Sequence, residues 1–253
     1  MDLLSLNQNI GKLVHSENIR ESHLEVRELE YYRWFHFGDN AIQSVIDVTQ
    51  PAKILLPIPQ AMLSFLLWKN TPMTVLNLGV GGGCFERYFQ PFSGITLSSV
   101  EISSQVIDVA KNYFYLPKDH LIHVESAEVY LQNNQQKFDV ILCDIFANQD
   151  NPACLYDQDF YHDLNKNCTG SSLVFINLFP INEQNVVEII TLIKPFFGHV
   201  ALIEFEHYKN IVLVLSQQTL PNKSLLLTEN NHGKNVASID FSSVIERWYV
   251  ITN

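Results

Sequence analysis

A glycine-rich segment and a later carboxylate are the residues of this chain best suited to chemistry. Gly79-Val80-Gly81-Gly82-Gly83 follows the apolar run TVLNL, and Glu101 comes 22 residues after Gly79, where a second apolar run ends. Glycines at a strand-to-helix turn permit positive φ angles and let a ligand approach the backbone closely. An acid after the next strand can accept hydrogen bonds from both hydroxyls of a ribose. The spacing favours a nucleoside-binding βαβ unit over a tight turn beside an exposed acid.

The glycine pattern also separates two classes of nucleotide ligand. A dinucleotide site normally reads G-x-G-x-x-G, because the third glycine lets the helix pack closely on the strand. Cys84 stands at that third position here. S-adenosyl ligands carry no phosphate and tolerate G-x-G-x-G. The loop therefore favours a methyltransferase-like fold over a nicotinamide-dependent enzyme.

A second acid, Asp144, ends the apolar run VILCD. An acid at the end of a buried strand needs a polar partner or solvent. Open α/β sheets place their ligands at the carboxyl ends of parallel strands. We therefore expect Asp144 at a ligand site, with a loop cap as the simpler alternative.

The composition excludes several classes of protein. The chain has 253 residues, 47% hydrophobic and 17% charged, and a formal net charge of -11, so a globular core is expected and a large nucleic-acid footprint is not. The longest apolar run, residues 54–68, is broken by prolines and is too short to span a bilayer. The N-terminus lacks a basic-then-apolar signal layout, and the four cysteines form no C-x-x-C motif. We expect a cytoplasmic protein with reduced thiols and no membrane partner.

Strand and helix patterns alternate along most of the chain. Apolar strands are expected at 74–79, 95–101, 121–124, 137–146 and 171–179, separated by helices that include 85–89, 103–114, 127–131, 157–164 and 182–197. Strands that are apolar throughout and alternate with helices predict a parallel sheet covered on both faces. Residues 199–206 and 210–217 are expected as an antiparallel pair.

The two ends of the chain read differently from this alternating region. Residues 1–20 look like a loose or partly helical lead-in, and 22–50 look like a small antiparallel β-piece with a turn at Gly38-Asp39-Asn40. The pattern predicts a helix near 59–69 and a C-terminal helix carrying Val244, Ile245, Trp248 and Val250. The expected organisation is a β-rich piece (1–52), a Rossmann-like nucleoside-binding domain (53–217) and a C-terminal loop and helix (218–253).

Several segments together resemble the spermidine synthase (aminopropyltransferase) family, in particular its divergent bacterial members. The matching stretches are VLNLGVGGGCFERYF, VEISSQVIDVAKNYFYLPKDHLIHV, FDVILCDIF, LYDQDFY and LVFINLFP, in the order and spacing of the family, with GDNAIQS before them. The resemblance covers roughly two thirds of the chain. It implies a Rossmann-like, class I methyltransferase-type sheet with a small N-terminal antiparallel β-domain, usually as a homodimer.

The resemblance also implies a reaction and a set of site residues. In that family a polyamine attacks the methylene carbon beside the sulfonium of decarboxylated S-adenosylmethionine, and an aspartate at the position of Asp144 accepts the proton of the amine. The resemblance implies that the loop glycines Gly79, Gly81 and Gly83 hold the nucleoside and that Glu101 binds its ribose. Ile102, Ser126 and Ala127 would lie beside the adenine, and Gln43 would line the pocket from the N-terminal piece. Asn177 would face the acceptor.

Three departures from the family pattern concern acids. Gly82 stands where the family has an aspartate that holds the aminopropyl ammonium, Ser126 replaces an adenine-binding aspartate, and Ala147 replaces a second acid after Asp144. The tyrosine-histidine-glutamate motif before the first strand is also absent. Candidates for compensation are Asp150, Asp157 and Asp159, although the last two also suit an ordinary helix N-terminus.

Three functions follow as alternatives. The first is a spermidine synthase-like transferase that uses decarboxylated S-adenosylmethionine and a polyamine. The second is an S-adenosylmethionine-dependent methyltransferase, and the third is a non-catalytic scaffold that has lost the pocket. No metal site is expected, because His120 and His123 lack a third ligand at metal spacing.

Overall fold

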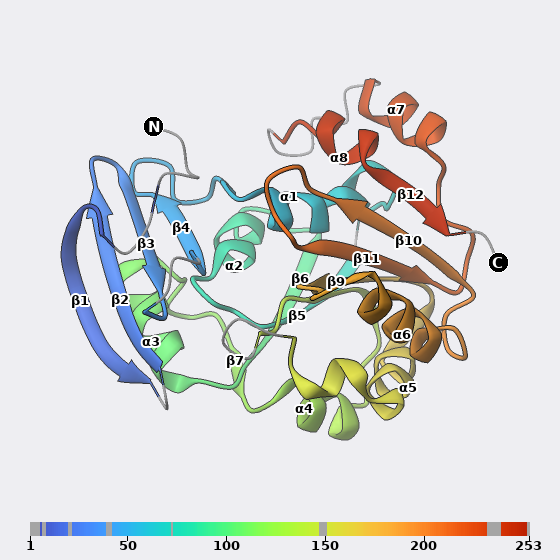
Figure 1. Cartoon of the computed structure of the whole chain (residues 1–253), viewed down its shortest axis with the longest axis horizontal. Coiled ribbons are helices and arrows are strands. Elements are labelled where there is room, and N and C mark those ends of the chain that lie inside the picture. The colour runs from blue at the N-terminus through green and yellow to red at the C-terminus, as the bar shows by residue number, and fades with distance from the viewer. Residues whose placement is uncertain are drawn as a thin grey trace.

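Two β-sheets form the framework of the computed structural model, which describes residues 6, 9–19, 22–38, 42–71, 73–146, 151–231 and 239–251. A four-stranded sheet holds the N-terminal strands and an eight-stranded sheet holds the others. The small sheet lies at one end of the molecule, and the large sheet lies at the other end between its helices (Figure 1). The expected α/β class is confirmed: a large, mostly parallel sheet accompanies a small N-terminal antiparallel sheet.

The small sheet is an antiparallel meander of β1 (Lys12–Ile19), β2 (Ser22–Leu29), β3 (Tyr32–His36) and β4 (Ser44–Asp47). The prediction of a loose or helical lead-in was wrong for residues 12–19, which form β1. This strand lies at the edge of the sheet and most of its side chains are exposed or half-buried, so its sequence lacks the apolar alternation of an inner strand. Asp39 and Asn40 of the predicted turn lie outside the described residues.

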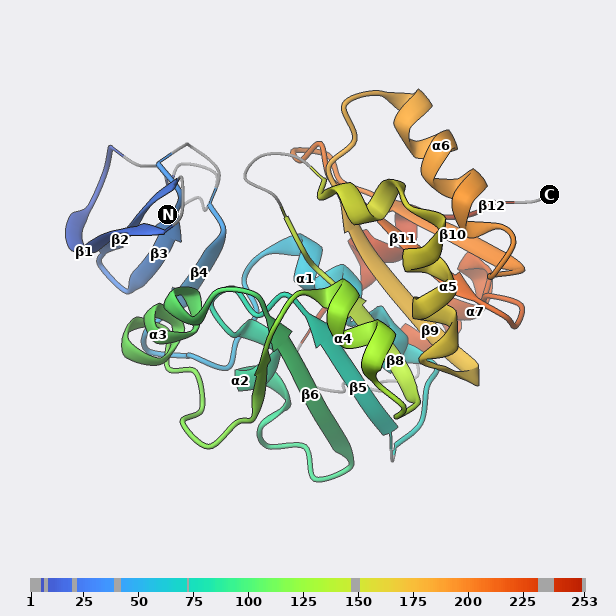
Figure 2. The same cartoon turned by 90° about the horizontal axis from the view of Figure 1, so that it is seen from below.

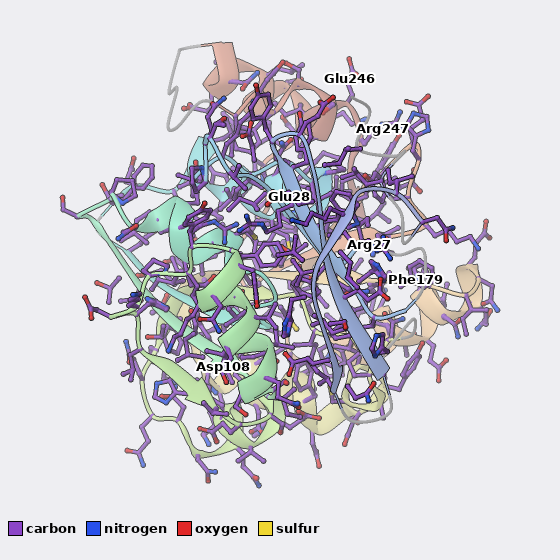
Figure 3. The ribbon with its side chains drawn as sticks, turned by 90° about the vertical axis from the view of Figure 1, so that its left-hand side faces the viewer. Arg27, Glu28, Asp108, Phe179, Glu246 and Arg247 are labelled. Atoms are coloured by element: carbon purple, nitrogen blue, oxygen red, sulfur yellow. The ribbon has the colours of Figure 1, made fainter. Side chains whose placement is uncertain are left out.

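One face of the small sheet packs on helix α3 (Ser104–Tyr113) of the large unit. The contact is apolar and is made by Leu24, Val26, Phe35, Val106, Val109 and Phe114. Figure 3 shows this end of the molecule, with Arg27 and Glu28 on the strands of the sheet and Asp108 on the helix. The N-terminal strands therefore share a core with the helix that follows Glu101.

The large sheet has the strand order β12-β10-β11-β9-β8-β5-β6-β7. Its strands are β5 (Met73–Leu78), β6 (Ile95–Glu101), β7 (Ile122–Val124), β8 (Phe138–Cys143), β9 (Cys168–Leu178), β10 (His199–Glu204), β11 (Ile211–Ser216) and β12 (Trp248–Ile251). The strands from β7 to β9 in this order are parallel, whereas β11 is antiparallel to β9 and to β10. The predicted antiparallel pair of 199–206 and 210–217 is thus confirmed.

Both faces of the large sheet are buried, which explains why its strands are apolar throughout. In β9, for example, Leu173 and Phe175 join one core, and Val174 and Ile176 join the other. One face is covered by α1 (Pro57–Met62), the 3-10 helix η2 (Ser64–Leu67), α2 (Cys84–Phe89), α7 (Lys223–Asn231) and α8 (Ser242–Glu246). The other is covered by α4 (Ala127–Asn133), the 3-10 helix η3 (Ala153–Tyr156), α5 (Gln158–Lys166) and α6 (Glu183–Ile193) (Figure 2). None of these helices is both long and apolar enough to cross a membrane within the described part of the chain.

The C-terminal segment differs from its prediction. Val244 and Ile245 lie in α8, but Trp248 and Val250 lie in β12, which pairs antiparallel with β10. The run Trp-Tyr-Val-Ile consists of aromatic and β-branched residues, which favour a strand. The indole nitrogen of Trp248 donates to the carbonyl of Pro221 at 3.0 Å. The connector between β11 and α7 therefore fixes this side chain.

The strand order places a topological switch between β5 and β8. From β5 the chain continues outward to β6 and β7, and then returns to add β8 and β9 on the other side of β5. Open α/β sheets bind their ligands in the crevice at the carboxyl ends of such a pair of strands. The glycine loop follows β5 and Asp144 follows β8, so both lie at the carboxyl ends of this pair of strands.

Candidate active site

The glycine loop connects β5 to α2, and three of its residues have backbone conformations that favour glycine. Gly79, Gly81 and Gly83 have φ angles of 92°, 52° and 76°. The amide of Gly79 donates to the carbonyl of Val100 at 2.9 Å, which pins the loop to β6. A Cβ added to Gly79 would lie well inside contact distance of the backbone carbonyl oxygen of Asp144. The loop therefore packs directly against the backbone of the predicted proton acceptor.

Glu101 is tied to the same loop from the other side of β5. One carboxylate oxygen, Oε2, accepts from the amides of Val80 at 3.0 Å and Gly81 at 3.4 Å, and Oε1 accepts from the amide of Ser103 at 3.0 Å. Burial raises the pKa of Glu101, and these backbone hydrogen bonds act in the opposite direction. The carboxylate is thus held by backbone groups of the glycine loop and of the residues that follow β6.

Asp144 begins the loop after β8 and is half-buried. Its amide donates to the carbonyl of Leu78 at 2.8 Å, and its Oδ1 accepts from Nδ2 of Asn177 at 2.8 Å. Burial raises the pKa of Asp144, and the hydrogen bond from Asn177 lowers it. A carboxylate of raised basicity is suited to accept a proton. Its strand is separated from that of Glu101 only by β5, so the two strands are about 10 Å apart.

Asn177 is 5% exposed near the end of β9, beside β8. Besides its bond to Asp144, its Oδ1 accepts from Nδ2 of Asn210 at 3.0 Å. Asn210 precedes β11, the next strand of the sheet. Sequence reasoning missed Asn210, because nothing in a lone asparagine before a strand signals which partner it meets.

The other residues predicted to contact the nucleoside lie directly after Glu101 and at the start of α4. Ile102 is 49% exposed immediately after Glu101. Ser126 caps α4 by accepting from the amide of Val129 at 3.3 Å, and Ala127 is buried at the start of that helix. The preceding strand pairs Val124 with Glu101, which brings the start of α4 to the same edge of the sheet.

Gln43 and its neighbour connect the small sheet to the loop. The amide of Gln43 donates to the carbonyl of Phe35 at 3.0 Å, which sets the start of β4. The next residue, Ser44, is buried against Gly82. A Cβ at position 82 would collide with the hydroxyl and Cβ of Ser44. The N-terminal sheet therefore occupies the space where the resemblance places an acid.

A pair of substitutions tests this packing. Gly82→Asp is expected to cost about 1–3 kcal/mol of unfolding free energy, as overpacking usually does, and Ser44→Gly in the same chain should restore most of that loss. Thermal unfolding measures both, with Gly198→Asp as the control, because a Cβ at Gly198 meets nothing within 4 Å. If the double variant is no more stable than Gly82→Asp alone, the Ser44 side chain does not limit the space at position 82.

Arg87 is a buried residue of α2 that sequence reasoning also missed. Its Nε donates to the carbonyl of Pro51 at 2.7 Å, and its Nη1 donates to the carbonyls of Gly82 and Phe114, the latter at 2.7 Å. It joins the connector from the small sheet, the glycine loop and the end of α3. The signal in sequence is a pair of charged residues, Glu86 and Arg87, after a glycine loop, on a short helix whose other residues are apolar or aromatic.

Two of the three candidates for compensating acids, Asp157 and Asp159, are not among the hydrogen-bond partners of Asp144 in the described part of the chain. Asp157 caps α5 by accepting from the amide of Asp159 at 3.0 Å, and both side chains are exposed. With Glu128 and Asp163 they line a separate hollow between α4 and α5. Ala147 and Asp150 lie outside the described residues. Within the described ranges, no group of three or more His, Cys, Asp or Glu side chains could hold a metal ion.

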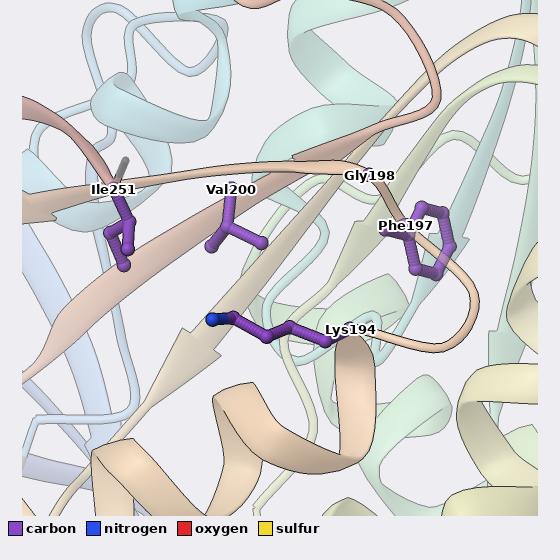
Figure 4. A pocket seen from close by; sticks show the side chains of 5 residues that line it. All are labelled: Lys194, Phe197, Gly198, Val200 and Ile251. Carbon is purple, nitrogen blue, oxygen red and sulfur yellow. The ribbon is translucent and has the colours of Figure 1, made fainter. Parts of the chain in front are cut away.

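A second hollow lies at the opposite edge of the large sheet. Lys194, Phe197, Val200 and Ile251 line it together with Gly198 (Figure 4). Its volume of about 80 Å³ is far below the several hundred Å³ of usual ligand pockets. It is therefore not an alternative nucleoside site.

Comparisons with known proteins agree with this picture of the fold. No family model matches the chain. Curated relatives include the polyamine aminopropyltransferase of Chromobacterium violaceum, 27% identical over 201 residues that cover 78% of this chain and 77% of the relative. Another is the polyamine aminopropyltransferase of Neisseria meningitidis serogroup A, 26% identical over 222 residues that cover 84% of each protein.

Solved structures extend the comparison. A probable spermidine synthase from Corynebacterium glutamicum aligns with a TM-score of 0.71 and 17% identity, covering 88% of each chain. A spermidine synthase in complex with the transition-state analogue AdoDATO aligns with a TM-score of 0.69 and 13% identity, over 95% of this chain and 85% of the other. Human methyltransferase-like protein 13, in complex with SAH, gives 0.62 and 20% identity, over 69% of this chain and 90% of the other.

The large sheet, its switch point and the structural neighbours define a Rossmann-like fold of the class shared by spermidine synthases and methyltransferases. The predicted fold class is thereby confirmed. Within that class, the chain is similar in sequence to the two curated proteins named polyamine aminopropyltransferase and similar in fold to the spermidine synthases.

Proposed function

We propose that the protein is an aminopropyltransferase that joins the aminopropyl group of a decarboxylated S-adenosylmethionine-type nucleoside to a polyamine. The observation that carries the proposal is the contact of two acidic residues with one glycine loop at the switch point, Glu101 through its carboxylate and Asp144 through its backbone. Glu101 accepts from the amides of Val80 and Gly81, and Asp144 packs its carbonyl on Gly79. The curated relatives that bear the name polyamine aminopropyltransferase support the same reaction class.

The nucleoside occupies the Glu101 side of the crevice in this proposal. Glu101 accepts hydrogen bonds from the ribose hydroxyls, and the exposed side chain of Ile102 covers the adenine, with Ser126 and Ala127 at its far edge. The positive φ angles of the loop glycines keep the backbone close to the ligand. Gln43 closes the pocket from the small sheet.

The acceptor amine lies on the Asp144 side. An alkylammonium has a pKa near that of lysine, about 10.4, so freeing its lone pair at pH 7 costs about 4–5 kcal/mol. Asp144 binds the cation and takes its proton. The nitrogen lone pair then forms the bond to the methylene carbon beside the sulfonium, the carbon–sulfur bond breaks, and its electron pair neutralises the sulfur. Methylthioadenosine leaves, and no metal or redox partner is needed for this balance.

Incubation of the purified chain with decarboxylated S-adenosylmethionine and a panel of amines, putrescine among them, tests the proposal. Chromatography should show methylthioadenosine and the extended polyamine in equal amounts. Formation of S-adenosylhomocysteine from ordinary S-adenosylmethionine, without methylthioadenosine from the decarboxylated form, would indicate a methyltransferase instead. If no product forms and no adenosyl ligand raises the melting temperature, the scaffold alternative replaces the proposal, because a ligand at 100 times its Kd should stabilise by about 2.7 kcal/mol.

A further inference from the structure

Three polar side chains form a chain of hydrogen bonds across three neighbouring strands. Nδ2 of Asn210 donates to Oδ1 of Asn177 at 3.0 Å, and Nδ2 of Asn177 donates to Oδ1 of Asp144 at 2.8 Å. The residues belong to the ends of β11, β9 and β8, which lie side by side in the sheet. The antiparallel register, with Val212 opposite Asn177, sets Asn210 just beyond the end of the pair.

The orientation of the central amide decides what Asp144 receives. An asparagine side chain presents an oxygen on one side and an NH2 group on the other, and a rotation of 180° exchanges them. An ionised carboxylate only accepts, so it requires the NH2 group of Asn177. In the opposite orientation two oxygens would face each other unless Asp144 carried a proton. Asn210 donates to the oxygen of Asn177 and therefore favours the same orientation as the ionised Asp144.

We propose that Asn210 is a positioning residue for the reaction: it fixes the amide of Asn177 so that its NH2 group holds Oδ1 of Asp144 and leaves the second carboxylate oxygen to the acceptor amine. This inference rests on the proposed function. Asn177 is 5% exposed, so its amide has little access to water that could replace the bond from Asn210. The function of Asn210 is thus to keep the base ionised and correctly turned rather than to contact the substrate.

Other ionisable groups near Asp144 do not supply this control. The thiols of Cys84, on α2, and Cys143, on β8, lie close to its carboxylate, and burial raises the pKa of both, that of Cys84 to about 12. Both thiols therefore stay neutral across the working pH range. Glu101 stands on the far side of β5, where its carboxylate is held by the loop. On the β9 side, the amide of Asn177 is the group that faces the base within the described residues.

Substitution of Asn210 by Leu removes the donor at similar volume. We expect kcat to fall about tenfold, which is the usual cost of one lost hydrogen bond, here the bond that orients Asn177 toward the Asp144 carboxylate. The KM for the nucleoside should stay unchanged. The acid limb of the pH profile of kcat/KM should move to higher pH, because Asp144 loses part of the bond that lowers its pKa. Asn210→Asp should move it further, since a carboxylate at 210 draws the NH2 group of Asn177 away from Asp144 and adds a negative charge.

Two controls separate a positioning role from a structural one. His207→Leu changes an exposed residue of the same connector and should leave kcat and the pH profile unchanged. In an Asn177→Ala background, Asn210→Leu should cause no further loss, because the residue acts through that amide. Equal losses in both backgrounds, or an unchanged acid limb in Asn210→Leu, would overturn the inference.

A measurement without turnover distinguishes this inference from the proposed function. Carbon-13 NMR titration of the Asp144 carboxyl, assigned by its disappearance in Asp144→Asn, reports its pKa directly. We expect a higher pKa in Asn210→Leu than in the unsubstituted chain and no such difference in the Asn177→Ala background. An absence of product with every amine would reject the proposed function while the titration still decides the role of Asn210.

Discussion

Replacing Asp144 with asparagine is expected to lower the rate of amine alkylation about 10²- to 10⁴-fold, the usual range for loss of a general base. The amide keeps the size of the side chain but cannot take the proton of the ammonium. Nucleoside binding should persist, because Glu101 lies on the other side of β5 and the loop packs against the backbone of Asp144, which the substitution leaves unchanged. The unsubstituted protein should lose activity as the pH falls through the pKa of Asp144, which burial holds above its ordinary value.

Release of methylthioadenosine under saturating decarboxylated nucleoside measures this loss, and the shift in melting temperature with methylthioadenosine measures the retained binding. Asp108→Asn is the matched control, since Asp108 is an exposed acid on α3 (Figure 3). It should behave like the unsubstituted chain. An Asp144→Asn protein that works within threefold of normal, with its acid limb intact, would show that another group accepts the proton.

Gly79→Ala should be the most destabilising single change in the loop, at about 3 kcal/mol or more. A φ of 92° is unfavourable for alanine, at about 1–3 kcal/mol, and the new methyl group would strike the backbone carbonyl of Asp144. Backbone cannot rotate away as a flexible side chain can, so overpacking adds about 1–3 kcal/mol. The melting temperature should fall by about 6–12 °C, and the displaced Asp144 should lose activity as well.

Two other glycines calibrate that result. Gly81→Ala shares the positive φ, 52°, but its methyl group meets nothing within 4 Å, so about 1–2 kcal/mol is expected. Gly170→Ala has open space and no positive φ, so a change below about 0.5 kcal/mol is expected. Denaturant unfolding of the three variants ranks them. If Gly79→Ala loses no more stability than Gly81→Ala, the expected clash between the new methyl group and the Asp144 carbonyl does not occur.

Much of the large sheet could be predicted from sequence because its signals are local. The strand expected at 95–101 is β6. A serine at 103 or 104 suits the cap of the next helix, and Ser103 is the one whose Oγ accepts from the amide of Val106, at 3.2 Å. The edge strands β1 and β12 were missed, because an edge strand need not alternate and is recognised mainly by its neighbour. The helix expected near 59–69 is divided into α1 and η2.

The candidate site was predictable to the same extent. Glu101 and Asp144 could be placed because acids that end apolar strands of a parallel sheet must meet at one edge. Ser44 and Asn210 could not, because their roles come from contacts with Gly82 and Asn177, which are far away in the chain. Packing between distant segments has no periodic signature in one sequence.

Arg87 also suggests how such a chain can change its chemistry and still fold. Its guanidinium donates hydrogen bonds to the main-chain oxygens of residues 51, 82 and 114, and every amino acid has such an oxygen. This anchor is therefore indifferent to the side chains around it. Side chains beside these three backbone positions can therefore change without loss of the hydrogen bonds that Arg87 makes.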